Sequence, residues 1–199
     1  MKKHELIPIA ILIAVFAQVA MSAFAPTSHA QWPGPLENTK DRPKLLTFGL
    51  FVTPNAEQNP INPPERFIGY HTALDIEIFE NEINKEVPVY SVCDGQILYA
   101  AEAGGYGGVI VHSCELNGEP VTILYGHIAP RSFTKKVGDS IKTGEQLGML
   151  GSEKSPESGF TRKHLHFGIH RGTQIELLGY VQDKKDLEEF INPETIIAK

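Results

Sequence analysis

Four histidines and one aspartate of this sequence occur with the spacings that metal chemistry requires. His71 and Asp75 are separated by three residues in YHTALDIE, and His164 and His166 by one residue in KHLHFGIH. On a β-strand, residues two positions apart point to the same face, so both imidazoles of the second pair would face one way. If the first stretch is also extended, its histidine and aspartate share a face as well.

A fifth candidate, His127, follows an apolar run in LYGHIAP, where a loop would present it to a cleft. A catalytic zinc ion usually takes three protein ligands and keeps its fourth position for water. His71, Asp75 and one member of the HLH pair would supply that set, and zinc lowers the pKa of its bound water towards about 7. Two imidazoles then remain for a general base and for a donor to a developing oxyanion. The residues therefore predict one catalytic Zn²⁺ ion per chain.

The interpretation depends on the coincidence of the three groups, because a single histidine is more often a surface or hydrogen-bonded residue than a ligand. A purely structural zinc site is disfavoured, since such sites are usually closed by four ligands and are often rich in cysteine. His112 in VIVHS and His170 in GIH are interpreted as strand residues outside the site.

The elements that must position these residues are predicted to be mostly strands. Short β-rich runs alternate with turn residues, and helical periodicity is almost absent outside Lys184 to Phe190. The expected strands are Leu45 to Val52, Val87 to Val92, Gln96 to Ala101, Val109 to His112 and Val121 to Tyr125. The pattern predicts a mainly β fold, an antiparallel β sandwich or partly open barrel with a short C-terminal helix.

Two segments have a similar order of apolar strand, glycine-containing turn and apolar strand. They are VPVYSVCDGQILYA and KKVGDSIKTGEQLGMLG. The similarity favours a core built of hairpins, although two ordinary β-turns would give the same pattern.

The first thirty residues are predicted to be a secretory signal peptide. Two lysines precede an apolar run from Leu6 to Met21, and small residues lead to a cleavage site after Ala30. An uncut membrane anchor is the alternative, but the sixteen-residue run is shorter than the about 20 residues that span a bilayer. We expect no transmembrane span after cleavage, a polar lead-in or strap over residues 31–44 and a catalytic domain over 45–199. The protein would be exported to the periplasm or cell envelope.

The net charge limits the classes of partner that we expect, and the cysteines bear on the redox state of the compartment. The formal net charge of −6 gives no electrostatic reason to expect nucleic acid as a partner. Cys93 and Cys114 lie on expected strands without a recognisable catalytic signature. Export permits oxidation, so they are interpreted as a structural pair or as two buried thiols, and the sequence leaves these alternatives open.

The same motifs resemble the lysostaphin-type (LytM-like) zinc metallopeptidases, which hydrolyse peptidoglycan peptides. The resemblance extends from about Phe67 to Gly172 and depends on His71 with Asp75, the Tyr-x-His of residues 125–127 and the HLHF of residues 164–167. It implies a duplicated hairpin motif, zinc bound by His71, Asp75 and His166, and His127 and His164 as the catalytic pair.

Three features depart from the family pattern. Ala73 stands where the family usually has glycine, and Lys163 where relatives tend to have a small residue or proline. The acidic stretch from Ile76 to Glu86 is longer than in many relatives, and we interpret it as a solvated loop in preference to a substrate contact.

Two functions are compatible with the resemblance. The first is an exported zinc endopeptidase that cuts cross-links or stem peptides of bacterial peptidoglycan. The second is a non-enzymatic regulator that binds and activates a cell-wall amidase. The complete set of five site residues favours the enzyme, because regulators of this type usually have substitutions at the ligand positions. The sequence does not indicate the oligomeric state.

Overall fold

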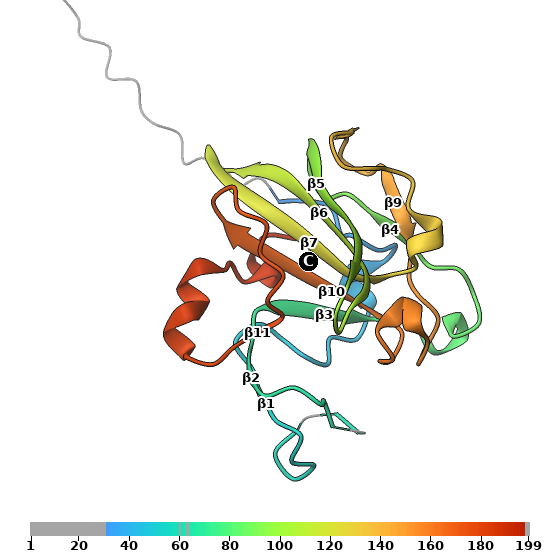
Figure 1. Cartoon of the computed structure of the whole chain (residues 1–199), viewed down its shortest axis with the longest axis vertical. Helices are drawn as coiled ribbons and strands as arrows, with labels where there is room; N and C mark the ends of the chain where they lie inside the picture. The colour runs from blue at the N-terminus through green and yellow to red at the C-terminus, as the bar shows by residue number, and fades with distance from the viewer. Residues whose placement is uncertain (1–30, 60, 63, 198–199) are drawn as a thin grey trace, which may run out of the picture.

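The structure is a computed structural model that describes residues 31–59, 61–62 and 64–197. The predicted signal peptide lies outside the described residues. Strands and short 3-10 helices are the regular elements of the described residues (Figure 1). The strands are β1 (Phe51–Val52), β2 (Gly69–His71), β3 (Ala73–Glu77), β4 (Pro88–Tyr90), β5 (Gly95–Ala103), β6 (Gly107–Leu116), β7 (Glu119–Ile128), β8 (Ser140–Ile141), β9 (Gln146–Met149), β10 (His164–Arg171) and β11 (Tyr180–Val181). The 3-10 helices are η1 (Thr39–Asp41), η2 (Glu80–Glu82), η3 (Pro130–Ser132), η4 (Pro156–Ser158), η5 (Lys184–Glu189) and η6 (Pro193–Thr195).

A six-stranded sheet in the order β3-β10-β7-β6-β5-β8 forms the centre of the molecule. Each pair of neighbouring strands in it is antiparallel. A three-stranded sheet, β1-β2-β11, and a two-stranded sheet, β4-β9, complete the fold. The predicted mainly β, antiparallel architecture is confirmed, and the described sheets form an open, sandwich-like arrangement.

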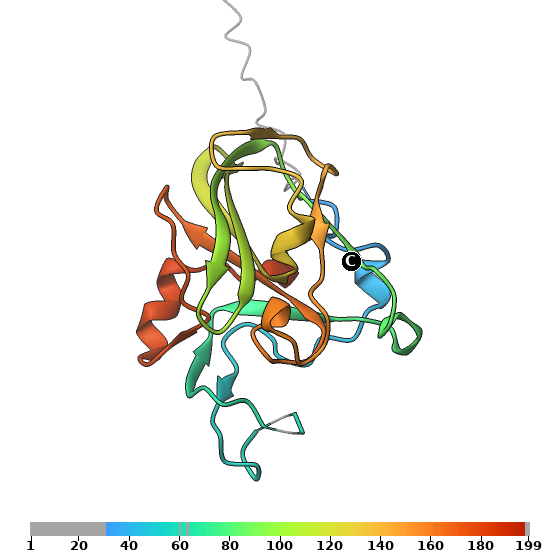
Figure 2. The ribbon, with the colours of Figure 1, turned by 45° about the vertical axis from the view of Figure 1, so that its right-hand side comes forward.

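The two faces of the large sheet have different surroundings. On one face, Ile110, Tyr125, Phe167 and their neighbours join Val89 of β4 and Leu147 of β9 in the main hydrophobic core. Figure 2 shows β9 beside the large sheet, with η3 between them. The opposite face carries a smaller cluster of Tyr106, Val109, Val111 and Leu124. We call these the core face and the cleft face.

Strand alternation places the HLH pair on the cleft face. Leu165 and Phe167 are fully buried in the main core, so His164 and His166, which alternate with them in β10, point the other way. This is the arrangement that the two-residue spacing predicts.

Several expected elements differ in extent from those of the structure. Only Phe51–Val52 of the expected strand at residues 45–52 is a strand, because the residues before it bond to β2 and β3 irregularly. The strands predicted near residues 96, 109 and 121 are longer than expected, at nine or ten residues each. The expected C-terminal helix is present as the 3-10 helix η5.

The segment 31–44 packs closely against the domain. Trp32 and Leu36 are buried in the main core, and Trp32 pairs with Ile197 near the other end of the described chain. Arg42 forms a bidentate ion pair with Glu82, so the segment also contacts the acidic stretch after β3.

Cys93 and Cys114 form a disulfide, with Cα atoms 6.1 Å apart. Of the two alternatives left open by the sequence, the structural pair is therefore correct. In the part of the chain that the structure describes, no helix is long and apolar enough to cross a membrane.

Candidate metal centre

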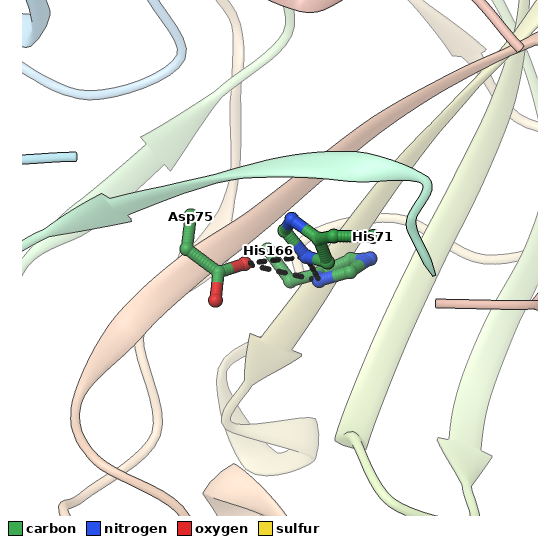
Figure 3. A group of neighbouring side chains, drawn as sticks. All are labelled: His71, Asp75 and His166. Atoms are coloured by element: carbon green, nitrogen blue, oxygen red, sulfur yellow. Dashed lines mark hydrogen bonds and ion pairs between the residues drawn. The ribbon is translucent and has the colours of Figure 1, made fainter. Parts of the chain in front are cut away.

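Three of the predicted site residues converge where β2, β3 and β10 meet. His71 ends β2, Asp75 is the middle residue of β3, and His166 lies directly opposite Asp75 in the β3-β10 pairing. Only Thr72 separates the two short strands, so His71 and Asp75 reach the same point from neighbouring elements. Figure 3 shows the three side chains directed towards one another.

The donor atoms of this triad form a nearly equilateral triangle. His71 Nε2 lies 3.2 Å from Asp75 Oδ1, His166 Nδ1 lies 3.1 Å from the same oxygen, and the two nitrogens are 3.2 Å apart. Zinc bonds of about 2.0–2.1 Å in a tetrahedral site would place ligand atoms roughly 3.3 Å apart. The triad therefore has the donor types and the spacing that could hold a metal ion.

The remaining ring nitrogen of each histidine is already engaged. His71 Nδ1 is placed to donate to the Thr47 carbonyl oxygen at 3.3 Å, and His166 Nε2 to the Tyr106 hydroxyl at 3.2 Å. Such partners fix the orientation of the ring and direct the other nitrogen's lone pair at the metal position. The triad is buried, with exposed fractions of 0% for His71, 1% for Asp75 and 4% for His166.

His127 and His164 lie beside the triad, with ring centroids 4.4 Å apart. His127 Nδ1 lies 2.9 Å from the carbonyl oxygens of Tyr106 and Ser158, and His164 Nδ1 lies 2.9 Å from that of Arg162. Because these contacts occupy the Nδ1–H group of each ring, each histidine presents Nε2. His164 Nε2 is 3.2 Å from Asp75 Oδ2. The structure thus brings all five predicted site residues together.

His127 reaches the cleft because of a bulge in β7. Gly108 of β6 pairs with Ile128 and the next residue, Val109, pairs with Gly126, so His127 is the extra residue. Its backbone has a φ of 64°, a left-handed conformation that costs a non-glycine residue roughly 1–2 kcal/mol. Bulges re-aim side chains near functional sites, and here the bulge redirects His127 from the core face, where Tyr125 points.

Gly126 makes room for the tyrosine that holds His166. A Cβ atom at Gly126 would lie 2.6 Å from the Tyr106 ring and 3.3 Å from the His166 Cβ. Only glycine at this position therefore leaves room for the Tyr106 ring, whose hydroxyl contacts His166.

Electrostatics favour a charged carboxylate and a neutral imidazole in the cleft. Burial alone would raise the pKa of Asp75, but His164, His71 and the hydrogen bonds from His164 and His166 outweigh it and hold that pKa well below its ordinary value. Burial, reinforced by the neighbouring His164 and His166, holds the pKa of His127 well below its ordinary value. Asp75 is thus available as an anionic ligand, and His127 is neutral at physiological pH.

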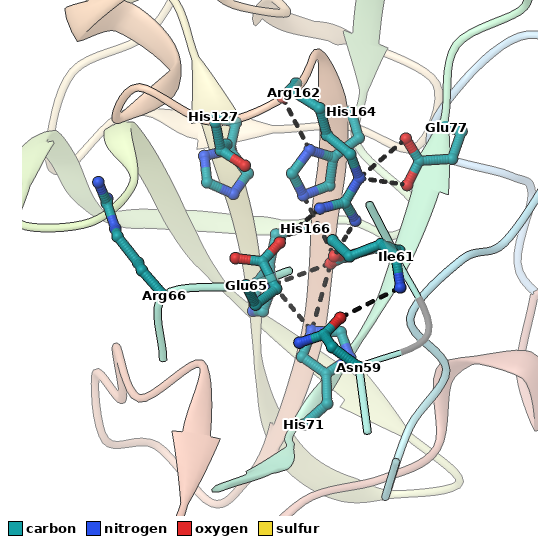
Figure 4. A network of polar contacts seen from close by, with 12 residues as sticks. Asn59, Ile61, Glu65, Arg66, His71, Glu77, His127, Arg162, His164 and His166 are labelled. Atoms are coloured by element: carbon teal, nitrogen blue, oxygen red, sulfur yellow. Dashed lines mark hydrogen bonds and ion pairs between the residues drawn. The ribbon is translucent and has the colours of Figure 1, made fainter. Parts of the chain in front are cut away.

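An arginine adjoins the triad on one side. The Arg162 guanidinium contacts Asp75 Oδ2 at 2.6 Å, Glu65 at 2.6 Å and Glu77 at 3.0 Å (Figure 4). Three carboxylates around one guanidinium leave surplus negative charge beside the triad, which favours a bound cation.

Asp75 and His166 of the triad and the two other histidines border an open cleft of about 930 Å³, with His71 buried behind them. Its walls carry Phe67, Phe160, Leu178 and Tyr180, with Glu65 and Arg162 near the triad. Phe67 and Tyr180 stack at 5.4 Å between ring centroids.

The departures from the family pattern have local explanations. Ala73 lies opposite Gly168 in the β3-β10 pairing, so the methyl group meets a residue without a side chain. Lys163 donates to the carbonyl oxygens of Glu82, Ile83 and Lys85. The interpretation of the acidic stretch as a solvated loop is only partly correct, because Glu77 is buried against Arg162 and Glu82 pairs with Arg42.

Sequence reasoning missed four residues that support the site. They are Thr47, Glu65, Tyr106 and Arg162. The sequence could have indicated a role for Arg162, because this basic residue lies two positions before the HLH pair and an acidic stretch lies elsewhere in the chain. The other two predicted strand histidines lie outside the triad: His112 is enclosed in the core, and His170 packs against Phe190.

A mainly β fold with a buried His-Asp-His triad beside two further histidines agrees with the family comparison. The pattern of peptidase family M23 matches residues 69–177, more than half of the chain. The chain belongs to peptidase family M23, and its resemblance to the lysostaphin-type enzymes is confirmed.

The relatives match different fractions of the chain. Endolysin 2638A of Staphylococcus phage 2638A is 31% identical over 115 residues, which are 58% of this chain but only 22% of the phage protein. The catalytic domain of the antimicrobial peptidase lysostaphin from Staphylococcus simulans has a similar fold, with a TM-score of 0.54 and 20% identity over 80% of this chain and 95% of that domain. A chain of the SpoIIQ-SpoIIIAH pore-forming complex also has a similar fold, with a TM-score of 0.56 and 16% identity over 86% of this chain and 94% of that one.

Proposed function

We propose that this protein is a zinc-dependent endopeptidase that hydrolyses cross-links or stem peptides of bacterial peptidoglycan. The observation that carries the proposal is the triangle of donor atoms from His71, Asp75 and His166, of which Asp75 and His166 line an open cleft. Membership of a peptidase family supports hydrolysis of a peptide bond. The relatives named as an endolysin and as an antimicrobial peptidase support the cell wall as the substrate.

The triad residues would hold one Zn²⁺ ion through His71 Nε2, Asp75 Oδ1 and His166 Nδ1. When bound at such a site, zinc activates water and polarises the scissile carbonyl. Three protein ligands would leave one coordination position for water, as in catalytic zinc sites.

His127 and His164 would move the protons of the reaction. His127 is neutral, so its Nε2 atom can accept a proton from the attacking water and pass it to the leaving amine. His164 would donate from Nε2 to the oxyanion that develops on the former carbonyl. The backbone carbonyls that bind both Nδ1 atoms keep the Nε2 atoms directed into the cleft.

The apolar walls would orient the peptide so that its scissile carbonyl faces the metal position. We also propose that the protein acts outside the cytoplasm, in the periplasm or cell envelope, which agrees with the predicted signal peptide and with the disulfide.

The test combines metal analysis with digestion of purified cell walls. The protein without residues 1–30 should contain one zinc per chain, release muropeptides with newly exposed amino groups and lose this activity with a chelator. His71→Ala should lose both zinc and activity. If the wild-type protein folds, binds no zinc and stimulates an amidase, the regulatory alternative is correct. The similar fold of a chain from a pore-forming complex is compatible with a non-enzymatic role.

A further inference from the structure

Two consecutive basic residues precede the HLH pair, and both contact the acidic stretch of residues 76–86, which begins at the end of β3. Arg162 contacts Glu77, and the Lys163 ammonium group donates to three backbone carbonyls between residues 82 and 85. Lys163 therefore holds the loop, whereas Arg162 lies in the cleft against the candidate metal centre.

The guanidinium of Arg162 uses all three of its nitrogens on carboxylates. Nε lies 3.0 and 3.1 Å from the two oxygens of Glu77, Nη1 lies 2.6 Å from Glu65, and Nη2 lies 2.6 Å from Asp75 Oδ2. Figure 4 shows the guanidinium between Glu65 and Glu77, beside His164. The planar fork of arginine is suited to this arrangement, which the point charge of lysine cannot reproduce.

The two oxygens of Asp75 have different partners. Oδ1 faces the nitrogens of His71 and His166, whereas Oδ2 receives Arg162 at 2.6 Å and lies 3.2 Å from His164 Nε2. The short, charged contact from Arg162 satisfies Oδ2 and prevents the carboxylate from rotating. Only one oxygen is then directed at the metal position.

The ion pairs of Arg162 with its three carboxylate partners are largely buried, which indicates a role other than stability. The Arg162 side chain is 18% exposed, Glu65 and Glu77 are each 10% exposed, and Asp75 is 2% exposed. Desolvation of buried ion pairs offsets most of their attraction, so such a cluster contributes little net stability compared with apolar residues of similar size. The presence of the cluster is better explained by its effect on geometry, since it fixes the orientation of the Asp75 carboxylate.

We propose that Arg162 is a positioning residue that holds Asp75 Oδ2, so that Asp75 binds the metal through Oδ1 alone. Glu77 on β3 and Glu65 on the cleft wall hold the guanidinium from two sides and fix its direction. This inference rests on the proposed function in one respect, that the triad binds zinc.

The test measures zinc affinity of the full chain after its signal peptide has been removed, by competition of the metal-free protein with a chromophoric chelator. Arg162→Gln and Arg162→Lys should each bind zinc 10- to 100-fold more weakly, the range of about 10–100-fold typical for residues that orient a ligand. Glu65→Gln leaves the Asp75 contact in place and should weaken binding less than either variant. Arg171→Gln is the matched control. Among the described residues, the Arg171 side chain donates to the Glu188 carbonyl alone, on an exposed surface, so the zinc affinity of this variant should equal that of the wild type.

A spectroscopic measurement separates positioning from simple loss of charge. The absorption spectrum of the Co²⁺-substituted protein reports coordination number, and it should change in Arg162→Gln and Arg162→Lys but not in Arg171→Gln. Unchanged zinc affinity and an unchanged cobalt spectrum in folded Arg162 variants would overturn the proposal. Failure of both variants to fold would overturn it too, since Arg162 would then be required for folding. If the wild type itself binds no zinc, the proposed function fails instead, so the two failures are distinguishable.

Discussion

The two faces of the large sheet each contain a buried histidine cluster, and the clusters differ in how their polar atoms are satisfied. On the core face, His112 Nδ1 is bonded to the Ser113 carbonyl, and its Nε2 lies 3.0 Å from the Tyr125 hydroxyl and 3.3 Å from that of Ser91. On the cleft face, two histidines and an aspartate direct donor atoms at one point. The core cluster is closed by protein partners, whereas the cleft cluster has a donor set that a cation would complete.

The difference shows that burial and residue type do not identify a functional histidine. His71 and His112 are both completely buried. What separates them is whether the lone pair of the second ring nitrogen has a protein donor or faces other acceptors. A buried acceptor that faces other acceptors is unfavourable unless a cation or a proton lies between them.

The largest contrast should come from the same substitution on the two faces. His166→Ala should reduce the rate of peptidoglycan hydrolysis at least about 1,000-fold and reduce zinc content, because it removes a proposed ligand. His112→Ala should keep its zinc and its activity while losing about 1–3 kcal/mol of stability, because it removes one hydrogen-bond partner from each of the buried Tyr125 and Ser91 hydroxyl groups. Zinc analysis, muropeptide release and urea unfolding of both variants make the comparison. Zinc loss in His112→Ala would remove the distinction between the faces.

His127 should be separable from the ligands. His127→Ala should reduce kcat by about 10²- to 10⁴-fold, the usual contribution of a general acid or base, while one zinc per chain is retained. Zinc content and single-turnover rates on a synthetic stem peptide measure the two effects. A variant that loses zinc in parallel with activity would place His127 among the ligands.

The disulfide should matter for stability alone. Replacing both Cys93 and Cys114 by alanine opens a loop with a sequence separation of 21 and should cost about 3 kcal/mol of the free energy of unfolding. The bond lies on the core face side, away from the triad, so the folded variant should keep full activity. Urea unfolding with and without reductant checks the first expectation, since reductant should lower the stability of the wild type but not that of the variant.

His112 should also make stability depend on pH. Burial, only partly offset by the hydrogen bond with Ser113, lowers the pKa of His112 to about 4, so between roughly pH 6.5 and 4 the unfolded chain binds a proton that the folded chain does not. The contribution of His112 is fully present above about pH 6.5 and should decline by at most about 3 kcal/mol as the pH falls to 4. His112→Gln should have a flatter stability profile than the wild type in this window. Parallel profiles from urea unfolding at several pH values would contradict the expectation.

The smallest effect should come from the cleft wall. Phe160 lines the cleft and is 64% exposed, so Phe160→Ala should raise KM a few-fold without changing kcat, because the contact is made equally in the ground and transition states. Phe51→Ala is the matched control, since Phe51 is also exposed but does not line the cleft. A fall in kcat would show that the ring positions the reacting bond.

Much of the site could be predicted because strand geometry is local. The two-residue repeat of a β-strand places His164 and His166 on one face, and the apolar Leu165 and Phe167 select the opposite face for the core. The same reasoning predicted a mainly β fold from short apolar runs and turn residues.

The same local repeat would have misplaced His127. Tyr125 is two residues earlier and points into the core, so regular alternation would send His127 there as well. A bulge in the pairing with β6 turns it to the cleft, and a bulge depends on register with another strand.

The sequence by itself determined which residue types were available for metal chemistry and which face of β10 they occupy, because both follow from composition and the period of a strand. Only the tertiary structure decided which nitrogens meet, that Cys93 and Cys114 are bonded, and that Arg162 holds Asp75. Arg162 is 87 residues from Asp75 and 97 from Glu65, and no local pattern specifies contacts over such separations. They arise from the order in which antiparallel strands join one sheet.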